Sequence, residues 1–150
     1  MAEGDATLYN AFKEDLLSKV HDLTNAADVL AVTLHTAYTP DIDLHQLWAD
    51  AGVSSTEYGT AAGYTAGGQV PANQAVSQND TSDRGEFDMD DETWTSLGAL
   101  TPATPSDAIF WNNTPAAPLD PLIGYVELGV TATDGNDFTL QWAAPAMTLT

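Results

Sequence analysis

The chain has 150 residues, of which 22 are acidic and only 3 are basic, and its formal net charge at pH 7 is −19. The three cations, Lys13, Lys19 and Arg84, are too few to neutralise these acids. This balance excludes binding to a nucleic-acid backbone, which needs clustered Lys and Arg. The absence of cysteine excludes disulfides, thiolate zinc sites and cysteine nucleophiles.

So acidic a surface repels itself in ordinary buffer and opposes compaction. At molar salt the Debye length falls to about 3 Å, and that repulsion is largely screened. An acidic disordered tail is the rival interpretation, but hydrophobic residues make up 43% of the chain and include four Trp, five Tyr and four Phe. The composition therefore predicts a folded protein adapted to a very salty interior, as in halophilic archaea, with one domain over residues 1–150.

The first predicted element is a helix over residues 7–20. Asp5 or Thr7 is expected to cap its start, and Lys19 is expected in its last turn, where a cation suits the helix dipole. The helix is predicted from apolar residues that recur every four positions, namely Leu8, Phe12, Leu16 and Val20.

The hydrophobic period then changes from that of a helix to that of a strand. Residues 29–35 alternate between a strongly apolar face and a mixed one, which predicts a strand. A short helix or turn is expected over residues 44–51. The small, polar and Gly-rich residues 52–68 are expected to form a loop with one irregular strand at most.

Several short strands with turns between them follow. In residues 86–90, Phe87 and Met89 are expected to point inward. The Asp134–Gly135 step predicts a hairpin turn that joins the strands on either side of it. The remaining predicted strands are residues 70–77, 93–100, 108–112, 122–130 and 137–143, with a final edge strand at 147–149. This pattern predicts a mainly β protein, an antiparallel β-sandwich of Greek-key or jelly-roll type with one N-terminal α-helix.

Catalytic and metal-binding motifs are weak in this sequence. Residues 86–92 are rich in carboxylates, but alternate carboxylates on one strand lie about 6.6 Å apart, too far to share one ion. Bound Ca²⁺ or Mg²⁺ near Asp41, Asp88 or Asp134 stays open as an alternative, as do monovalent cations on the acidic surface, and no other cofactor is expected. The histidines, His21, His35 and His45, lack the spacing of a zinc protease.

The aromatic residues divide into two groups by their predicted surroundings. Three tryptophans lie on predicted strands and are expected in the core: Trp94, Trp111 and Trp142. Aromatic residues outside the predicted strands are candidate anchors for an interface with another subunit: Tyr38, Trp48, Tyr58 and Tyr64.

Two long stretches carry a resemblance to a known family. Residues 8–16, LYNAFKEDL, resemble the YNSFKRDL start of small virion structural proteins from tailed bacterial and archaeal viruses. Residues 32–45, VTLHTAYTPDIDLH, resemble the same family's VALVTSSYTPDIDTH. Glu14 stands where the pattern has Arg, as suits a haloarchaeal host. The similarity continues in the same order through residues 63–68 (GYTAGG), 83–94 (DRGEFDMDDETW), 121–129 (PLIGYVELG) and 137–142 (DFTLQW).

The resemblance implies a virion protein made in the host cytoplasm, with no catalytic residues to carry over. We expect a capsid decoration or turret subunit that binds the major capsid protein or other virion proteins, as a trimer or pentamer. The alternative is a tail fibre, tail tip or baseplate component that takes part in host attachment. A cellular enzyme such as a glycosidase is the third and least supported class. No signal peptide or apolar run of the roughly 18 residues needed to cross a membrane is found, so no membrane partner is expected.

Lowering the salt from molar concentration to about 0.1 M is predicted to unfold the isolated protein, because the Debye length grows to about 10 Å and the acidic side chains repel one another again. Circular dichroism across a dilution series measures this loss. A spectrum that stays constant through the series would contradict it.

Overall fold

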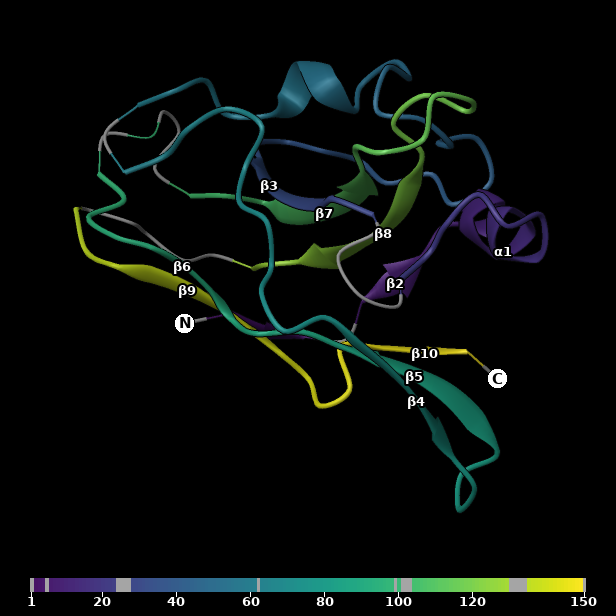
Figure 1. Ribbon diagram of the computed structural model, residues 1–150. Coiled ribbons are helices and arrows are strands. Elements are labelled where there is room, and N and C mark those ends of the chain that lie inside the picture. The colour runs from purple at the N-terminus through teal and green to yellow at the C-terminus, as the bar shows by residue number, and fades with distance from the viewer. Residues whose placement is uncertain are drawn as a thin grey trace.

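The computed structural model describes residues 6–23, 28–61, 63–98, 100, 104–129 and 135–149, and the backbone of residues 2–4. Two layers of strands face each other (Figure 1). The upper layer is one antiparallel sheet with the strand order β2-β8-β7-β3. Its strands are β2 (Thr7–Leu8), β3 (Leu30–His35), β7 (Asp107–Asn112) and β8 (Leu122–Glu127).

The lower layer consists of two three-stranded sheets, with the orders β1-β9-β6 and β10-β5-β4. Within it only β1 and β9 pair in parallel. The strands are β1 (Ala2–Gly4), β4 (Ala75–Asn79), β5 (Arg84–Asp88), β6 (Glu92–Trp94), β9 (Phe138–Trp142) and β10 (Met147–Leu149). One α-helix, α1 (Asn10–Leu17), and one short 3₁₀ helix, η1 (Ser54–Thr56), complete the elements of the described residues. The predicted fold class, a mainly β sandwich with a helix near the N-terminus, is confirmed.

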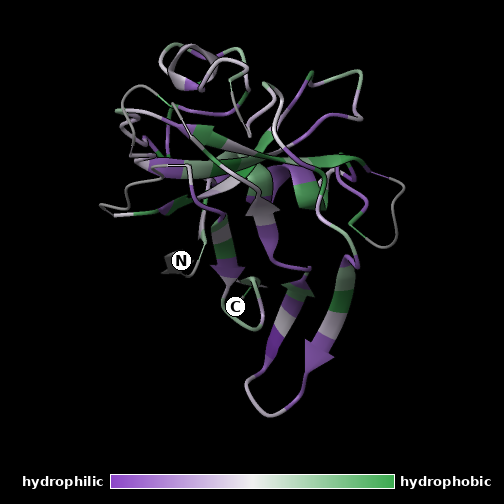
Figure 2. Ribbon diagram, turned by 90° about the vertical axis from the view of Figure 1, so that its left-hand side faces the viewer, coloured by the Kyte–Doolittle hydropathy of each residue, from purple (hydrophilic) through white to green (hydrophobic). Residues whose placement is uncertain are grey.

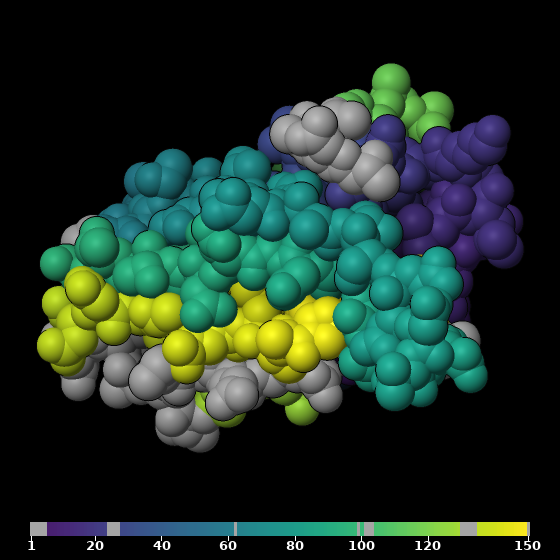
Figure 3. All heavy atoms as spheres, turned by 60° about the horizontal axis from the view of Figure 1, so that its bottom comes forward, coloured from purple at the N-terminus to yellow at the C-terminus, as the bar shows by residue number. Residues whose placement is uncertain are grey.

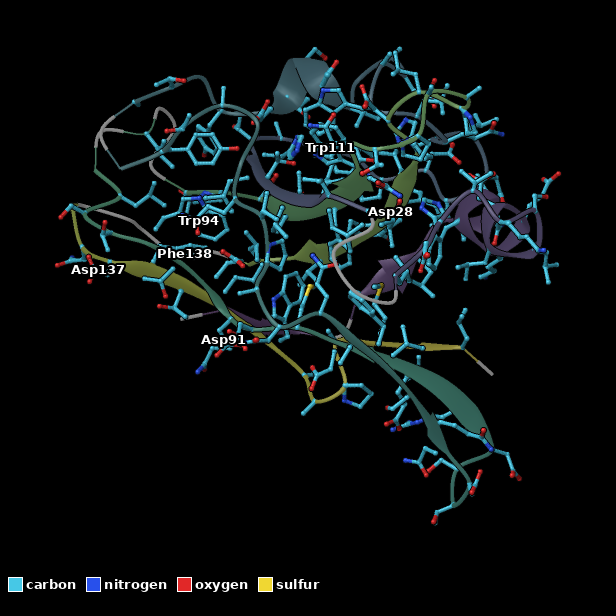
Figure 4. All side chains as sticks on the ribbon, viewed as in Figure 1. Asp28, Asp91, Trp94, Trp111, Asp137 and Phe138 are labelled. Atoms are coloured by element: carbon cyan, nitrogen blue, oxygen red, sulfur yellow. The ribbon has the colours of Figure 1, made fainter. Side chains whose placement is uncertain are left out.

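The main core fills the space between the two layers. Trp94 of β6 and Phe138 of β9 pack there with their ring centroids 5.8 Å apart (Figure 4). Trp111 is also buried, in a second cluster on the opposite face of the upper sheet. Trp94, Trp111 and Trp142 are thus all core residues, as predicted. Figure 2 shows apolar residues concentrated in the strands of the body, whereas the projecting β4–β5 hairpin is more polar.

Strand β3 is buried on both faces rather than on one. All six of its residues are buried, because η1 and the loop segments on either side of it cover the face on which the sequence has both polar and apolar residues. His35 and Thr33 lie on that face, and the His35 ring contacts Trp48 edge-on with the ring centroids 5.5 Å apart. The second, smaller core is built from this covering and includes Tyr9, Ala31, Tyr38, Val53, Ile109, Trp111 and Leu122.

The helix is shorter than the predicted range of residues 7–20. Thr7 and Leu8 instead form β2, which lies so close to β8 that a Cβ at Gly124 would come 2.8 Å from the Thr7 carbonyl oxygen. Tyr9 takes the N-cap position without a side-chain hydrogen bond, so Thr7 does not cap the helix; Asp5 lies outside the described residues. Lys19 lies beyond the helix at φ 59°, a left-handed conformation that ends helices.

The predicted hairpin between residues 122–130 and 137–143 is wrong. Strand β8 pairs with β7 and β2 in the upper layer, whereas β9 pairs with β6 and β1 in the lower layer. The connection therefore crosses from one layer to the other, and residues 131–134 of the expected turn lie outside the described residues. Alternation in each strand is equally compatible with either partner, so the turn signal alone gave the wrong pairing.

The other strand predictions fit to within a few residues, apart from residues 70–77 and 93–100. The first of these begins late, as β4 at Ala75, and the second is the short strand β6, which ends at Trp94. The inward positions of Phe87 and Met89 and the final edge strand at Met147–Leu149 are confirmed. Residues 44–51 form turns, and the described residues 52–61 and 63–68 form a loop with η1 and isolated bridges.

One carboxylate faces the core from the lower layer. Glu92 on β6 is only 6% exposed and follows Asp90 and Asp91 directly. Burial raises the pKa of Glu92 from 4.5 to about 7, and the neighbouring carboxylates of Asp90 and Asp91 raise it further in the same direction. Because the folded pKa is above the unfolded one, this side chain favours folding most below pH 4.5, and the contribution is lost as the pH rises to about 7.

Glu92→Gln is predicted to raise the free energy of unfolding by about 2 kcal/mol above pH 7, because the variant buries no charge. The gain should shrink as the pH falls toward 4.5. Denaturation at molar salt across this pH range measures it. Asp88→Asn removes the same charge from an exposed position of β5 and serves as the control for a general loss of repulsion. Equal gains in the two variants at every pH would contradict the prediction.

Candidate binding groove

An apolar groove lies between α1 and the inner face of the β10-β5-β4 sheet, at the right of Figure 1. Its volume is about 230 Å³. For scale, an apolar cavity of about 150 Å³ is large enough to hold a benzene molecule. The lining is apolar apart from His21, Asp22 and Glu86, and its other residues are Leu8, Phe12, Leu16, Leu23, Val76, Gly85, Phe87, Met147 and Leu149.

The register of the sheet explains why the floor is hollow. Val76, Phe87 and Met147 lie opposite one another in one row across the three strands. Gln78, Gly85 and Leu149 form the next row on the same face. Gly85 contributes no side chain to that row, and a Cβ built there would meet no heavy atom within 4 Å. The groove exists because a glycine occupies a position where strands normally carry an apolar side chain.

The rim of the groove is apolar as well. Leu17 at the end of α1 is 89% exposed, the highest value among the exposed large hydrophobic residues of the described chain. Leu149, Ile42 and Val76 are also exposed. A neighbouring hollow contains Leu17 and Ile42 and shares Leu8, Leu16 and Leu149 with the groove, so groove and rim form one continuous apolar surface.

The three basic residues of the chain lie on or just beyond two of the elements around the groove, although none of them lines it. Lys13 is on α1, Lys19 follows it by two residues, and Arg84 begins β5. The Arg84 Nε donates to Glu86 at 2.8 Å and Asn79 donates to the same carboxylate oxygen at 2.8 Å; these bonds, that from Arg84 first, lower the pKa of Glu86. The strands β2, β4 and β10 carry no charged residue.

His21 fixes one end of the groove to the upper sheet. Its Nδ1 accepts a hydrogen bond of 3.0 Å from Asn112, whose amide also donates to Asp28 at 2.5 Å. The His21 ring packs against Phe12 with the ring centroids 5.0 Å apart. Burial lowers the pKa of His21 to about 4, so the ring is neutral near pH 7 and acts as a hydrogen-bonded core residue.

The predicted interface anchors lie elsewhere and are mostly covered. Tyr38, Tyr58 and Tyr64 are only 6%, 4% and 2% exposed, because the loop segments that carry them fold back onto β3. Trp48 is half-buried and stacks on Trp111 with the ring centroids 4.6 Å apart. Tyr58 and Tyr64 therefore belong to the main core, whereas Tyr38 belongs to the second core and Trp48 packs at its border.

The other two histidines meet at one tyrosine. The Tyr38 hydroxyl lies 2.5 Å from that of Tyr9 and 2.8 Å from His45 Nδ1, and the His35 ring packs against the Tyr38 ring. His35 also hydrogen bonds to Thr56 at 3.0 Å. Burial lowers the pKa of His35 to about 3 and raises that of Tyr38 to about 12, so both groups are neutral at physiological pH. This network ties the loops to the upper sheet.

The cation sites considered from the sequence find little geometric support. Among the residues that the structure describes, no group of three or more His, Asp or Glu side chains is arranged to hold a metal ion. Asp88 is exposed on β5, and Asp134 lies outside the described residues. Asp41 accepts hydrogen bonds from the backbone N–H groups of Asp43 and Leu44, which is ordinary turn chemistry.

Comparison with protein-family models, with curated proteins and with solved structures finds no match to this chain. Within the described residues, no helix has the length and apolar character needed to span a bilayer.

The sequence analysis did not identify the groove residues as a site. Their two signals were a glycine in an alternating strand (Gly85) and a leucine beside the apolar stripe of the helix (Leu17).

Gly85→Leu is predicted to fill the groove from its floor while leaving the fold intact. Gly85 does not have a positive φ, and glycine within a strand costs stability, so the free energy of unfolding should stay equal or rise by about 0.5–1 kcal/mol. Binding of an apolar fluorescent dye at molar salt should fall. Gly59→Leu, at an exposed loop glycine that also has open space around its Cβ, is the matched control. Unchanged dye binding in Gly85→Leu would show that the groove is not an accessible apolar site.

Proposed function

We propose that this protein is a structural subunit of a halophilic tailed-virus particle, specifically a decoration or turret subunit that docks on the head shell through the α1/β5 groove. The observation that carries the proposal is the exposed apolar groove on a chain with a net charge of −19. The resemblance of residues 8–16 and 32–45 to small virion proteins supplies the particle as the setting.

Salt explains why an apolar contact suits this role. Charge pairs across an interface contribute little when the Debye length is about 3 Å. Burial of apolar surface does not depend on charge and supplies most of the favourable free energy in protein association. A neighbour that inserts one or two apolar side chains between Leu16 of α1 and Phe87 of β5 would keep its affinity in brine.

The surroundings of the groove suit a partner that is itself acidic. A shell protein of the same salty compartment would carry an acidic surface, and most of this chain would repel it when the salt is diluted. Strands β4 and β10 beside the groove carry no charge, and Glu86, one of its lining carboxylates, is paired with Arg84, so this face repels such a partner less than a surface of uncompensated acids would. Docking there would add buried area between neighbouring capsid subunits and so strengthen the shell.

Localisation on purified particles tests the proposed role. We expect labelled antibody to bind intact heads and protein quantification to give many copies for each head, as an icosahedral arrangement requires. Label only on detached tails, with a few copies for each particle, would overturn the head assignment in favour of a tail component.

Rebinding to depleted particles tests the groove itself. Wild-type protein and the Gly59→Leu control should reattach at molar salt, whereas Gly85→Leu should lose at least about tenfold in affinity, equivalent to 1.4 kcal/mol. Equal reattachment of Gly85→Leu would place the docking surface elsewhere on the molecule while leaving the particle assignment intact.

A further inference from the structure

Strand β4 ends its sheet with an open edge. It pairs with β5 through all five residues, from Ala75 opposite Asp88 to Asn79 opposite Arg84, without a bulge. Among the described strands, none pairs with its other side. Four of its five residues are exposed, among them Val76, whose exposed fraction is 50%. The β4–β5 hairpin projects from the body in Figure 1, and its teal atoms lie at the right of Figure 3, beside the yellow atoms of the C-terminal strand.

This edge lacks the features that normally prevent strand pairing. Natural proteins protect free edges with charged residues, proline, bulges or very short strands. The sequence of β4, Ala-Val-Ser-Gln-Asn, has no charge and no proline, although 22 of the 150 residues in the chain are acidic. A free row of backbone N–H and C=O groups on a regular, uncharged strand is a template for another strand.

The other strand edges in the described chain are protected. Strand β6 contains Glu92 and directly follows Asp90 and Asp91. Strand β3 is covered by bridges to Gln69 and Glu57. The remaining edge strands, β1, β2 and β10, have two or three residues each. Strand β4 is therefore the longest uncharged edge that the described residues leave open.

We propose that a second copy of this chain pairs with β4 in antiparallel fashion about a two-fold axis. Full overlap of the five residues places Ser77 on the axis, opposite Ser77 of the second copy, and Val76 opposite Gln78 of the second copy. The two sheets β10-β5-β4 then join into one continuous six-stranded sheet. The contact is isologous, since the same strand serves both subunits.

The uncharged edge is the part of the surface where a second copy meets the least charge repulsion. Two chains of charge −19 repel each other over most of their surfaces, and an uncharged strand is where they approach at least cost. Glu86, the neighbour of Ser77 on β5, already has Arg84 as its counter-ion at 2.8 Å. The backbone hydrogen bonds of the new ladder do not depend on charge, so the dimer should strengthen as salt screens the remaining repulsion.

The pairing also doubles the proposed docking site. Directly opposed residues in antiparallel strands point to the same face of a sheet, so the two grooves open on one side of the six-stranded sheet. Two linked grooves bind a repeated partner surface with higher avidity than one. The dimer itself is independent of the proposed particle role, and its failure would not affect that role.

Oligomeric state and crosslinking test the dimer. Wild-type protein should sediment as a dimer at molar salt. The chain contains no cysteine, so Ser77→Cys provides a single probe. Opposed Cα atoms in antiparallel strands lie about 4.5–5.5 Å apart, within the span of a disulfide. Under mild oxidation Ser77→Cys should crosslink at least about tenfold faster than Ser82→Cys, an exposed control in the turn of the same hairpin.

Two proline variants show whether backbone pairing holds the dimer. Backbone N–H groups alternate between the two edges of a strand, so one of Ser77→Pro and Gln78→Pro removes an outward N–H and spares the ladder with β5. That variant should keep the wild-type circular dichroism spectrum and sediment as a monomer. A monomeric wild-type protein at molar salt, or equal crosslinking of Ser77→Cys and Ser82→Cys, would overturn the proposal.

Discussion

Repulsion among uncompensated carboxylates is the constraint under which every other feature of this molecule must work. Among the described residues, the only ion pair between a Lys or Arg and an acid is Arg84–Glu86. Ion pairs therefore cannot hold the fold together. Apolar burial between the layers and the backbone ladders of the sheets must do so, and both act independently of salt screening.

The same constraint explains the second core above the upper sheet. A mixed strand face such as that of β3 would ordinarily be solvated. Here His35, Thr33 and Tyr38 are covered by loops and satisfied by neutral hydrogen bonds, such as that between Tyr38 and His45 at 2.8 Å. Burial keeps His35 neutral by lowering its pKa, so the histidine adds no charge to this covered face. The loops are therefore held to the sheet by hydrogen bonds between neutral side chains rather than by ion pairs.

Local patterns in the sequence predicted the strands better than their partners. Alternation placed Phe87 and Met89 inward correctly, because side-chain period is a property of one strand alone. Pairing depends on contacts between distant segments, so the Asp134–Gly135 signal could not reveal that β8 and β9 belong to different layers. The predicted start of the helix was wrong for the same reason, because Thr7 and Leu8 pair with β8, more than a hundred residues away.

The candidate site shows why a search for surface anchors by residue type fails in this chain. Aromatic residues on loops were expected to face a partner, yet Tyr58 and Tyr64 are buried and pack their loops against β3. The Tyr64 hydroxyl also donates a hydrogen bond of 2.7 Å to Glu57.

The binding surfaces proposed for this chain arise instead where a side chain or a charge is absent. A side chain is absent at Gly85, and charge is absent from β4. Both features belong to the three-stranded sheet β10-β5-β4: the groove lies on its inner face, and the open edge is that of its outermost strand. In a chain that places a carboxylate at about one position in seven, the segments without charge are where contact with another protein is cheapest.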